Sequence, residues 1–441
     1  MKICMIGTGY VGLVTGTCFS ELGFDVTCVD IDKGKIDRLN EGVIPIYEPG
    51  LEDLVKKNTK AGRLKFSTDV TKTVAQSSVI FIAVGTPSSE SGHEADLKYV
   101  FGAAKNIAES MQGYTVIVTK STVPVDTAKK LEAYIKEVNP EADFDVVSNP
   151  EFLREGSAIE DFMRPDRVVI GCRTQRAEAV MRKLYTPLSL SETPIVFTSP
   201  ESSELIKYAA NSFLATKITF INQIADLCEK CDANVHDVAR GMGLDDRIGK
   251  KFLNTGPGYG GSCFPKDTLA MAWTARQYGT PLEIVEAVID ANEKRKINMA
   301  TKIQEACGGD LNGKTVAVLG VTFKPDTDDM RDSPSLTIIP KLQEMGAKVT
   351  AYDPVGMKNG ADILSNVSWN PDAYTTLGGA HALVILTEWN EFRYLDLEKV
   401  KKHMAVPLVI DLRNIYRPEY MKKAGFAYHS LGRRSIDPSK E

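Results

Sequence analysis

Residues 2–12 read KICMIGTGYVG, and this stretch decides the fold of the first part of the chain. Residues 2–6 are an apolar run of strand length, and the three glycines that follow have the spacing G-x-G-x-x-G ahead of an apolar helical stretch. A second apolar run, residues 25–29, ends in Asp30. A strand, a glycine turn, a helix and a second strand followed by an acid are the parts of a dinucleotide-binding unit. The sequence therefore predicts a doubly wound α/β domain here.

The glycine turn also predicts the cofactor. Gly7, Gly9 and Gly12 permit a tight turn and let a pyrophosphate approach the N-terminus of the helix. Asp30 is placed to accept hydrogen bonds from the adenosine ribose diol, and its charge repels a 2'-phosphate, so we expect NAD and not NADP. Lys35 is either a further cofactor contact or a solvated helix lysine. The alternative to the whole interpretation is a glycine turn in an unrelated α/β protein.

Composition excludes several classes of function. A chain of 441 residues is too long for one core and predicts two or three domains. A net charge of -5 without a basic block argues against nucleic acid as a partner. The longest apolar runs have strand length, so no membrane span is predicted. The first residues lack the features of a signal peptide and the eight scattered cysteines fit reduced thiols, so we expect a cytoplasmic protein.

Small hydroxyl side chains, prolines and an acid follow three more apolar runs. The three runs are residues 79–84, 115–119 and 145–147, and they are followed by Thr86, Thr122 and Glu151 respectively. A fourth apolar run lies at residues 167–170. Because the carboxyl ends of parallel strands share one edge of a sheet, we expect the three side chains to line the same crevice as the glycine turn. Turns at the ends of strands in any fold are the alternative. Glu155 would share a face with Glu151 if residues 152–158 were helical.

The middle of the chain predicts one long helix. Ser199, Pro200 and Glu201 are a capping serine, a first-position proline and a first-turn acid, and apolar residues then recur at helical spacing for about 30 residues. Such a helix suits a spine between domains or a dimer interface. Lys207 and Asn211 lie one turn apart on it, and they are either site residues or ordinary surface residues. Cys228 and Cys231, farther along, have no second pair or histidine cluster, so no metal site is predicted.

The stretch GPGYGGSCFPKD, residues 256–267, has four glycines in six positions. Glycine at this density usually marks a close approach of backbone to a ligand. Cys263 follows, with Lys266 nearby to favour the thiolate and Asp267 able to exchange a proton, which together predict an activated nucleophile. A buried, unreactive cysteine is the alternative.

A second α/β rhythm begins near residue 312. Its first turn, GVTFK at 320–324, lacks the three glycines, so we expect this half to bind a nucleotide differently or to bind another ligand. Lys324 and Arg331 could reach phosphates, and Arg413 follows a strand. The expected elements are strands at 315–319, 348–352, 382–386 and 407–410, a helix at 335–345, and a polar, mobile tail from residue 433 to 441.

Four segments carry a resemblance to a known family. They are GPGYGGSCFPKD, ELIKYAANSFLATKITFINQIADLCE, NPEFLREGSAI and VLGVTFKPDTDDMRDSP. These segments resemble those of the nucleotide-sugar dehydrogenases of the UDP-glucose/GDP-mannose dehydrogenase family, and the resemblance covers nearly the whole chain. The resemblance implies an α/β fold of two doubly wound Rossmann-like domains joined by a long central helix and a helical connector. The implied domains are an NAD-binding domain at residues 1–198, a central dimerisation domain with the nucleophile loop at 199–310, and a UDP-sugar-binding domain at 311–441.

The resemblance also implies catalytic roles. Cys263 would form a thiohemiacetal and then a thioester, and Lys207 and Asn211 would stabilise the oxyanion beside the reacting carbon. Asp267 and Thr122 would hold the catalytic water, and Glu151 would assist thioester hydrolysis. Contacts with NAD are implied for Gly7, Gly9, Tyr10, Val11, Gly12, Asp30, Lys35, Thr86, Thr122, Glu155, Lys266 and Arg331. Contacts with the UDP-sugar are implied for Glu151, Phe152, Leu153, Arg154, Glu155, Lys207, Asn211, Asn254, Tyr259, Gly260, Lys324, Arg413 and, from a neighbouring subunit, Arg247.

The expected reaction is an NAD-dependent, two-step oxidation of UDP-glucose to UDP-glucuronate by a homodimer or higher homo-oligomer. The same chemistry on UDP-N-acetylmannosamine or GDP-mannose is the nearest alternative. A single-step hydroxyacid dehydrogenase would not need Cys263. A non-catalytic, NAD-binding redox sensor would leave Lys207, Asn211 and Asp267 without a role.

Overall fold

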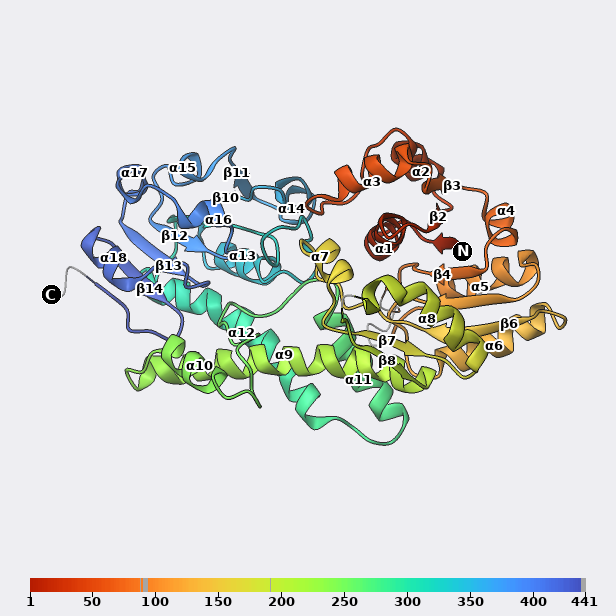
Figure 1. Ribbon diagram of the computed structural model, residues 1–441. Coiled ribbons are helices and arrows are strands. Elements are labelled where there is room, and N and C mark those ends of the chain that lie inside the picture. Colours follow the sequence, from red (N-terminus) through yellow and green to blue (C-terminus); the bar gives the residue numbers. More distant parts are fainter. Residues whose placement is uncertain (88, 90–93, 191, 438–441) are drawn as a thin grey trace. The chain divides into compact units, whose positions relative to one another are not determined.

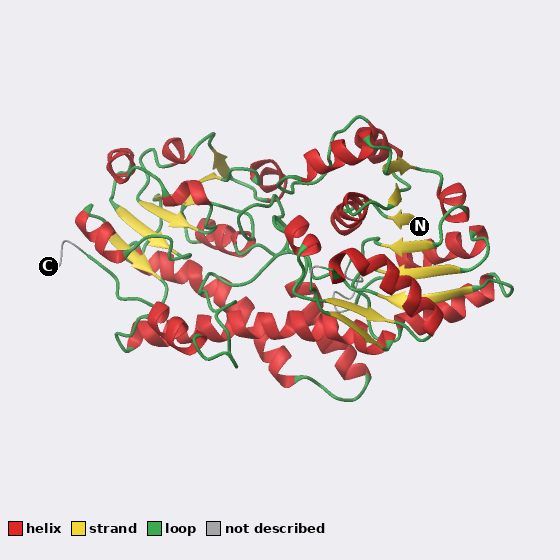
Figure 2. Ribbon diagram, in the orientation of Figure 1, coloured by secondary structure: helices red, strands yellow, loops and turns green. Residues whose placement is uncertain are grey.

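The computed structural model describes residues 1–87, 89, 94–190 and 192–437. The chain forms two compact units, one of Met1–Ala210 with Trp273–Thr280 and one of Asn211–Ala272 with Pro281–Glu441. Each unit contains one sheet with helices packed against it, so the fold class is α/β as predicted (Figures 1 and 2).

The sheet of the first unit has eight strands in the order β3-β2-β1-β4-β5-β6-β7-β8. Neighbours are parallel except β6 and β7, which meet in one antiparallel bridge between Ser148 and Gly171. Interior strands such as VIFI of β4 are continuous apolar runs because both faces of the sheet are covered. The bounds are Lys2–Ile6 (β1), Asp25–Val29 (β2), Leu64–Ser67 (β3), Val79–Ile82 (β4), Thr115–Thr119 (β5), Phe144–Ser148 (β6), Val168–Gly171 (β7) and Ile195–Thr198 (β8).

Helices form a core on each face of this sheet. One core joins alternate strand residues to α1 (Tyr10–Glu21), α2 (Lys33–Asn40), α3 (Leu51–Lys60), α7 (Ala158–Met163) and α8 (Gln175–Ser189). The other joins the remaining strand residues to α4 (Val70–Ala75), α5 (Lys98–Ser110) and α6 (Thr127–Val138). Because the strands run in parallel, most of their carboxyl ends reach one edge between these two helical layers.

The sheet of the second unit has six parallel strands in the order β11-β10-β9-β12-β13-β14. Their bounds are Thr315–Leu319 (β9), Lys348–Tyr352 (β10), Val367–Trp369 (β11), Ala382–Ile385 (β12), Leu408–Asp411 (β13) and Ala427–Ser430 (β14). One face packs on α12 (Glu283–Ala306) and α13 (Ser335–Glu344). The other packs on α15 (Ala373–Thr376), α16 (Asn390–Arg393), α17 (Leu397–His403) and α18 (Pro418–Lys423), and α14 (Met357–Ile363) precedes β11.

The predicted long helix is confirmed as α9, Pro200–Lys230. It begins where predicted, because Ser199 Oγ accepts a hydrogen bond from Ser202 N at 3.2 Å and proline takes the first position. Two shorter helices follow it, α10 (Val235–Gly243) and α11 (Phe264–Gln277). None of the helices in the described ranges combines the length and the apolar character needed to cross a membrane.

Three predictions of local structure were wrong or incomplete. Strands β3, β8, β11 and β14 have no counterpart among the predicted runs. The tail is anchored at its start, because buried Arg433 donates to Ser430 Oγ at 3.0 Å and Ile436 forms a bridge with Tyr428. The last four residues of that predicted tail lie outside the described residues. The third prediction, a helix over residues 152–158, is wrong because the helix α7 begins only at Ala158.

Candidate active site

The turn after β1 has the geometry of a dinucleotide-binding turn. Gly7 has φ +102°, and its N–H donates to Val29 O at 2.8 Å, which joins the turn to β2. A Cβ on Gly12 would lie 2.0 Å from Gly7 O, so only glycine lets the helix pack so close. A Cβ on Gly9, the N-cap of α1, would meet no described atom within 4 Å. Space for a pyrophosphate therefore exists at the first amides of α1.

Asp30 lies beside this turn. Its Oδ2 accepts hydrogen bonds from Thr8 N at 2.9 Å and Thr8 Oγ1 at 2.7 Å, and its Oδ1 accepts one from Asp32 N at 3.1 Å. Burial acts to raise the pKa of Asp30, but these hydrogen bonds and the charge of Lys35 outweigh it and hold the pKa below its usual value. Lys35 Nζ lies 3.4 Å from Oδ2, so this lysine is an ion-pair partner and is not merely solvated. An ionised acid here fits the ribose of NAD.

The predicted strand ends do meet at one edge of the first sheet. Strands β4, β5 and β6 are parallel neighbours, so the residues that follow them are brought together. Thr86 Oγ1, after β4, donates to Thr122 O, after β5, at 3.1 Å. Glu151 follows β6, the next strand in the sheet. The turn after β1 lies on the other side of β4.

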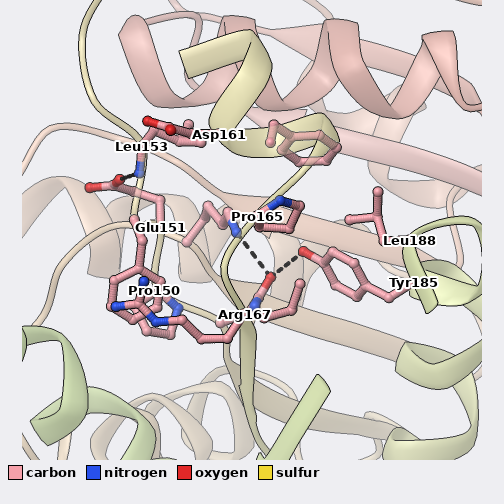
Figure 3. Close-up of a pocket in the computed structure, with 13 residues that line it drawn as sticks. Pro150, Glu151, Leu153, Asp161, Pro165, Arg167, Tyr185 and Leu188 are labelled. Atoms are coloured by element: carbon pink, nitrogen blue, oxygen red, sulfur yellow. Dashed lines mark hydrogen bonds between the residues drawn. The ribbon is translucent and has the colours of Figure 1, made fainter. Parts of the chain in front are cut away.

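Glu151 and Lys207 form a buried ion pair. Glu151 Oε1 accepts from Lys207 Nζ at 3.1 Å. Glu151 Oε2 accepts from Leu153 N at 2.6 Å (Figure 3). Their side chains are only 6% and 4% exposed, so the pair is shielded from water. The ring of Phe152 contacts two cations, with Lys207 Nζ 5.3 Å and Arg167 Cζ 3.7 Å from its centroid. Desolvation lowers the pKa of Arg167.

Residues 152–157 are not helical, so the predicted shared face of Glu151 and Glu155 does not form. The helix α7 begins only at Ala158, because buried Glu48 already binds the amides around its start: Gly156 N donates to Glu48 Oε2 at 2.7 Å and Ala158 N donates to Oε1 at 2.8 Å. Tyr10 OH also donates to Glu48. Arg154, predicted as a substrate ligand, forms an ion pair with Asp161 at 2.5 Å.

A buried polar cluster lies behind Glu151. Asn149 Oδ1 accepts from Tyr185 OH at 2.5 Å and from Lys120 Nζ at 3.2 Å (Figure 3). Asn149 Nδ2 donates to Val169 O at 2.7 Å. These side chains line a pocket of about 40 Å³ that Glu151 also lines. None of the three is among the predicted site residues. A lysine directly after a strand and an asparagine two residues before Glu151 were the available signals.

The glycine-rich stretch passes close to the protein's own backbone. A Cβ on Gly260 would lie 2.2 Å from Asp332 O, and one on Gly261 would lie 2.7 Å from the ring of Phe323. Gly261 N also donates to Arg331 O at 2.8 Å. Glycine is therefore required here by contact with residues 323–333, a physical cause that differs from the predicted approach to a ligand.

Side chains of α9 and α12 hold the start of this stretch. Asn222 Oδ1 accepts from Gly256 N at 2.8 Å and from Thr255 Oγ1 at 3.0 Å. Arg295 Nε donates to Gly256 O at 2.6 Å, and the amide of Asn292 makes two hydrogen bonds with the backbone of Tyr259. Neither asparagine nor Arg295 is predicted from the sequence, because only the fold brings them to the loop.

Cys263 directly precedes α11 and is partly exposed. The positive end of a helix favours an anionic sulfur at this position. Ser262 Oγ lies 3.5 Å from its Sγ. Asp267 is fully buried one turn later, where Oδ2 accepts from Asn211 Nδ2 at 2.6 Å and Oδ1 pairs with Lys266 Nζ at 2.7 Å. Lys266 thus neutralises Asp267, whereas the sequence predicted that it would act on the thiol.

The first turn of the second sheet is closed by its own acid. Asp353, after β10, corresponds to Asp30 after β2, but it is fully buried. Its Oδ2 accepts from Val321 N at 2.7 Å, Thr322 N at 3.2 Å and Trp389 Nε1 at 3.2 Å. Its Oδ1 accepts from Val355 N and Gly356 N. No acceptor position is left for a ribose, which supports the prediction that this half binds its ligand differently.

The other basic residues differ in their surroundings. Arg413 lies beside the glycine-rich stretch, where its guanidinium donates to Leu386 O at 2.6 Å and to Phe323 O at 3.0 Å. Lys324 Nζ is 5.5 Å from the centroid of the Phe323 ring. Three further predicted ligands, Arg331, Arg247 and Asn254, are exposed. Arg331 pairs with Asp329 and Arg247 pairs with Asp245.

The described residues hold no group of three or more His, Cys, Asp or Glu side chains placed for a metal ion. The turn after β1 and the ionised Asp30 instead fit a dinucleotide. With two doubly wound sheets and a cysteine at a helix N-terminus, they define an NAD-dependent dehydrogenase.

The chain belongs to the UDP-glucose/GDP-mannose dehydrogenase family. Residues 1–189 match its NAD binding domain, residues 201–294 its central domain and residues 317–418 its UDP binding domain. The UDP-glucose 6-dehydrogenase of Rhizobium meliloti (strain 1021) is 58% identical over 98% of this chain and 100% of its own length.

Two solved structures show the same fold over nearly the whole chain. The UDP-glucose dehydrogenase of the archaeon Pyrobaculum islandicum superposes with a TM-score of 0.90 at 36% identity, covering 97% of this chain and 96% of its own. The UDP-D-ManNAc dehydrogenase of Pyrococcus horikoshii has a TM-score of 0.85 at 26% identity, covering 99% of this chain and 100% of its own.

Proposed function

We propose that this enzyme oxidises UDP-glucose to UDP-glucuronate in two NAD-dependent steps, through a thiohemiacetal and a thioester on Cys263. The observation that carries the proposal is the partly exposed thiol at the N-terminus of α11, one turn before the buried Asp267 and its hydrogen bond from Asn211. The identity of 58% with a relative named for UDP-glucose supports the choice of substrate.

Cys263 explains why two oxidations can occur on one enzyme. NAD, when bound at the turn after β1, would supply the hydride acceptor for each oxidation. The thiolate adds to the aldehyde carbon, so the second hydride leaves from a tetrahedral adduct and a thioester results. Asn211 and Lys207, one turn apart on α9, donate hydrogen bonds to the oxygen that becomes negative in this adduct.

Hydrolysis of the thioester completes the reaction. Water attacks the acyl carbon, the C–S bond breaks, and the thiol returns as the carboxylate leaves. We assign the position of this water to Asp267 and Thr122, and the removal of its proton to Glu151. The Lys207–Glu151 ion pair supports this assignment, because it keeps an ionised carboxylate and an ammonium together in a buried place.

We propose the three domains expected from the sequence, 1–198, 199–310 and 311–441, and the ligand contacts assigned here come from all three. We assign NAD to the turn after β1, with Asp30 on the ribose. Segment 151–155, residues 254–260, Lys324 and Arg413 are assigned to the UDP-sugar, and Glu155, Lys266 and Arg331 to the cofactor. The closeness of Arg413 to Gly256, where an added Cβ would lie 3.2 Å from the guanidinium, supports its place in this set.

The sibling substrates are the second candidate, because the UDP-D-ManNAc dehydrogenase of Pyrococcus horikoshii shares the fold. A limiting, weighed amount of UDP-glucose with excess NAD decides between them. We expect two equivalents of NADH per sugar and a product that has gained a carboxylate, because the cysteine adduct holds the aldehyde for its second oxidation. One equivalent would contradict the role of Cys263. No NADH would reject UDP-glucose, and UDP-N-acetylmannosamine and GDP-mannose would be tested next.

We further propose that the enzyme is a homodimer formed through α9. Phe213, Phe220 and Leu227 recur every seven residues on this helix with 66%, 48% and 59% of their surfaces exposed, and a second copy would cover such a stripe. We also assign the enzyme to the cytoplasm, since the eight cysteines, all within the described residues, form no disulfide.

The solution mass tests the dimer. The wild type should have twice the chain mass of 48.3 kDa, and Leu227→Glu should lower it towards one chain because a buried unpaired charge opposes association. Tyr420→Glu is the matched control, since Tyr420 is 61% exposed on α18, away from this stripe in sequence. A wild-type monomer, or a dimer that tolerates Leu227→Glu, would contradict the proposal.

A further inference from the structure

Lys120 is a buried lysine whose partner is neutral. Only 5% of its surface is exposed, and its Nζ donates to the side-chain carbonyl of Asn149 at 3.2 Å. Within the described ranges, Lys120 forms no ion pair. Burial of an ammonium without a hydrogen-bonded carboxylate is unfavourable, so a residue of this kind calls for a functional explanation.

The charges around Lys120 are those of the Glu151–Lys207 pair. Burial lowers the pKa of Lys120 to about 8, attraction to Glu151 acts in the opposite direction, and repulsion by Lys207 lowers it further. Arg167, Asp161 and Tyr185 line the same pocket, and Asp161 already has Arg154 as its partner. The carboxylate of Glu151 is therefore attracted by two ammonium groups, those of Lys207 and Lys120.

Asn149 links Lys120 to the backbone that carries Glu151. Asn149 N donates to Thr119 O at 2.9 Å, and its Nδ2 donates to Val169 O. Its Oδ1 accepts from Lys120 and Tyr185 (Figure 3), so both ends of its side chain and its backbone amide are held. Glu151 lies two residues farther on. A substitution at Lys120 can therefore move Glu151 through the segment 149–151. It also removes the electrostatic attraction between the two side chains.

We propose that Lys120 is a positioning residue for Glu151, and that the fold accepts a lower stability to keep its ammonium there. This inference rests on the proposed function, in which Glu151 assists hydrolysis of the thioester. Lys120 itself touches neither the substrate nor the thiol in this scheme. Its effect should therefore appear in the hydrolytic step more than in hydride transfer.

Lys120→Met tests the first half of the proposal, because methionine has a similar length and no charge. We expect kcat to fall about 10- to 100-fold, the effect of a misplaced catalytic group. Intact-protein mass spectrometry of the reacting enzyme should show the sugar acyl adduct accumulating on Cys263. Lys120→Arg should retain more activity, since it keeps the charge and the adjacent pocket of about 40 Å³ gives the larger group room. Tyr185→Phe removes a neutral hydrogen bond to the same Asn149 oxygen and is the matched control. Its kcat should fall by less than about threefold.

Thermal unfolding tests the second half and needs no substrate. Lys120→Met should raise Tm by about 2–4 °C at pH 7 because it removes a buried charge. Below pH 8, Lys120 is protonated in both the folded and the unfolded chain, so the folded state carries the full free-energy cost of the buried ammonium. Between about pH 8 and 10.5 the unfolded chain binds more protons, so wild-type stability gains on the variant as pH rises. The advantage of Lys120→Met should therefore vanish above about pH 10.5.

The outcomes separate two failures. A wild type that makes no NADH from UDP-glucose overturns the proposed function. A wild type that makes two equivalents, with Lys120→Met unchanged in kcat or equal to Tyr185→Phe, overturns the role of Lys120. A loss of Tm in Lys120→Met at pH 7 also overturns it, because the lysine would then be a structural residue.

Discussion

Cys263→Ser is expected to lower kcat for acid formation by on the order of 10³-fold or more, while the fold and NAD binding remain. A serine hydroxyl at the N-terminus of α11 stays protonated near neutral pH, so it adds to the aldehyde far more weakly than a thiolate does. The side chain is partly exposed and nearly isosteric, so little packing is lost. The measurement is NADH and carboxylate formed per UDP-glucose, together with NAD affinity by calorimetry.

Cys231→Ser is the matched control for this prediction. Cys231 is exposed at the end of α9 and makes only a weak contact, with its Sγ 3.9 Å from Cys228 O. Its replacement should leave kcat unchanged. Turnover of Cys263→Ser equal to that of the wild type would remove the covalent mechanism, and loss of NAD affinity would show a damaged fold instead.

Gly260→Ala should have the second-largest effect, and it should act on both stability and rate. The added Cβ would lie 2.2 Å from Asp332 O and 2.8 Å from Asp332 C, and both are backbone atoms that cannot rotate away. The loop must shift by roughly 1 Å to relieve the overlap, which predicts a loss of about 1–3 kcal/mol in the free energy of unfolding and about 100-fold in kcat. Urea denaturation and initial rates of NADH formation measure the two effects.

Gly241→Ala provides the comparison. This glycine lies in α10, and a Cβ there would meet no described atom within 4 Å. Because alanine is the better helix former, the variant should gain about 0.5–1 kcal/mol and keep the wild-type rate. If Gly260→Ala behaved in the same way, residues 323–333 would not restrain the glycine-rich stretch.

The strands that sequence patterns identify are the interior ones. Each of β1, β2, β5, β9 and β10 has the bounds predicted for it. The four strands that patterns do not reveal, β3, β8, β11 and β14, are the two edges of each sheet. An edge strand is short and less fully covered, so it lacks a continuous apolar run and resembles a loop in sequence. AYHS in β14 is an example.

The site divides in a similar way. Residues whose chemistry is tied to local sequence, such as Asp30 after a strand or Cys263 after a glycine run, are found from the sequence. Those that act by long-range packing are not: Asn222 lies 34 positions before the amide that it binds at Gly256. Glu48 lies 108 positions before its partner Gly156. No local pattern contains such separations, and only the packed fold reveals them.

The closed carboxylate of Asp353 bears on how many dinucleotides one chain holds. In both sheets an acid follows the second strand of the nucleotide-binding pattern. The presence of two Rossmann-like sheets would therefore suggest two equivalent dinucleotide sites. The Asp30 side chain is 12% exposed, whereas both Asp353 oxygens accept hydrogen bonds, from backbone amides, the Thr322 hydroxyl and the Trp389 indole. We therefore expect calorimetry to find one NAD bound per polypeptide, with the second Rossmann-like sheet left for another nucleotide.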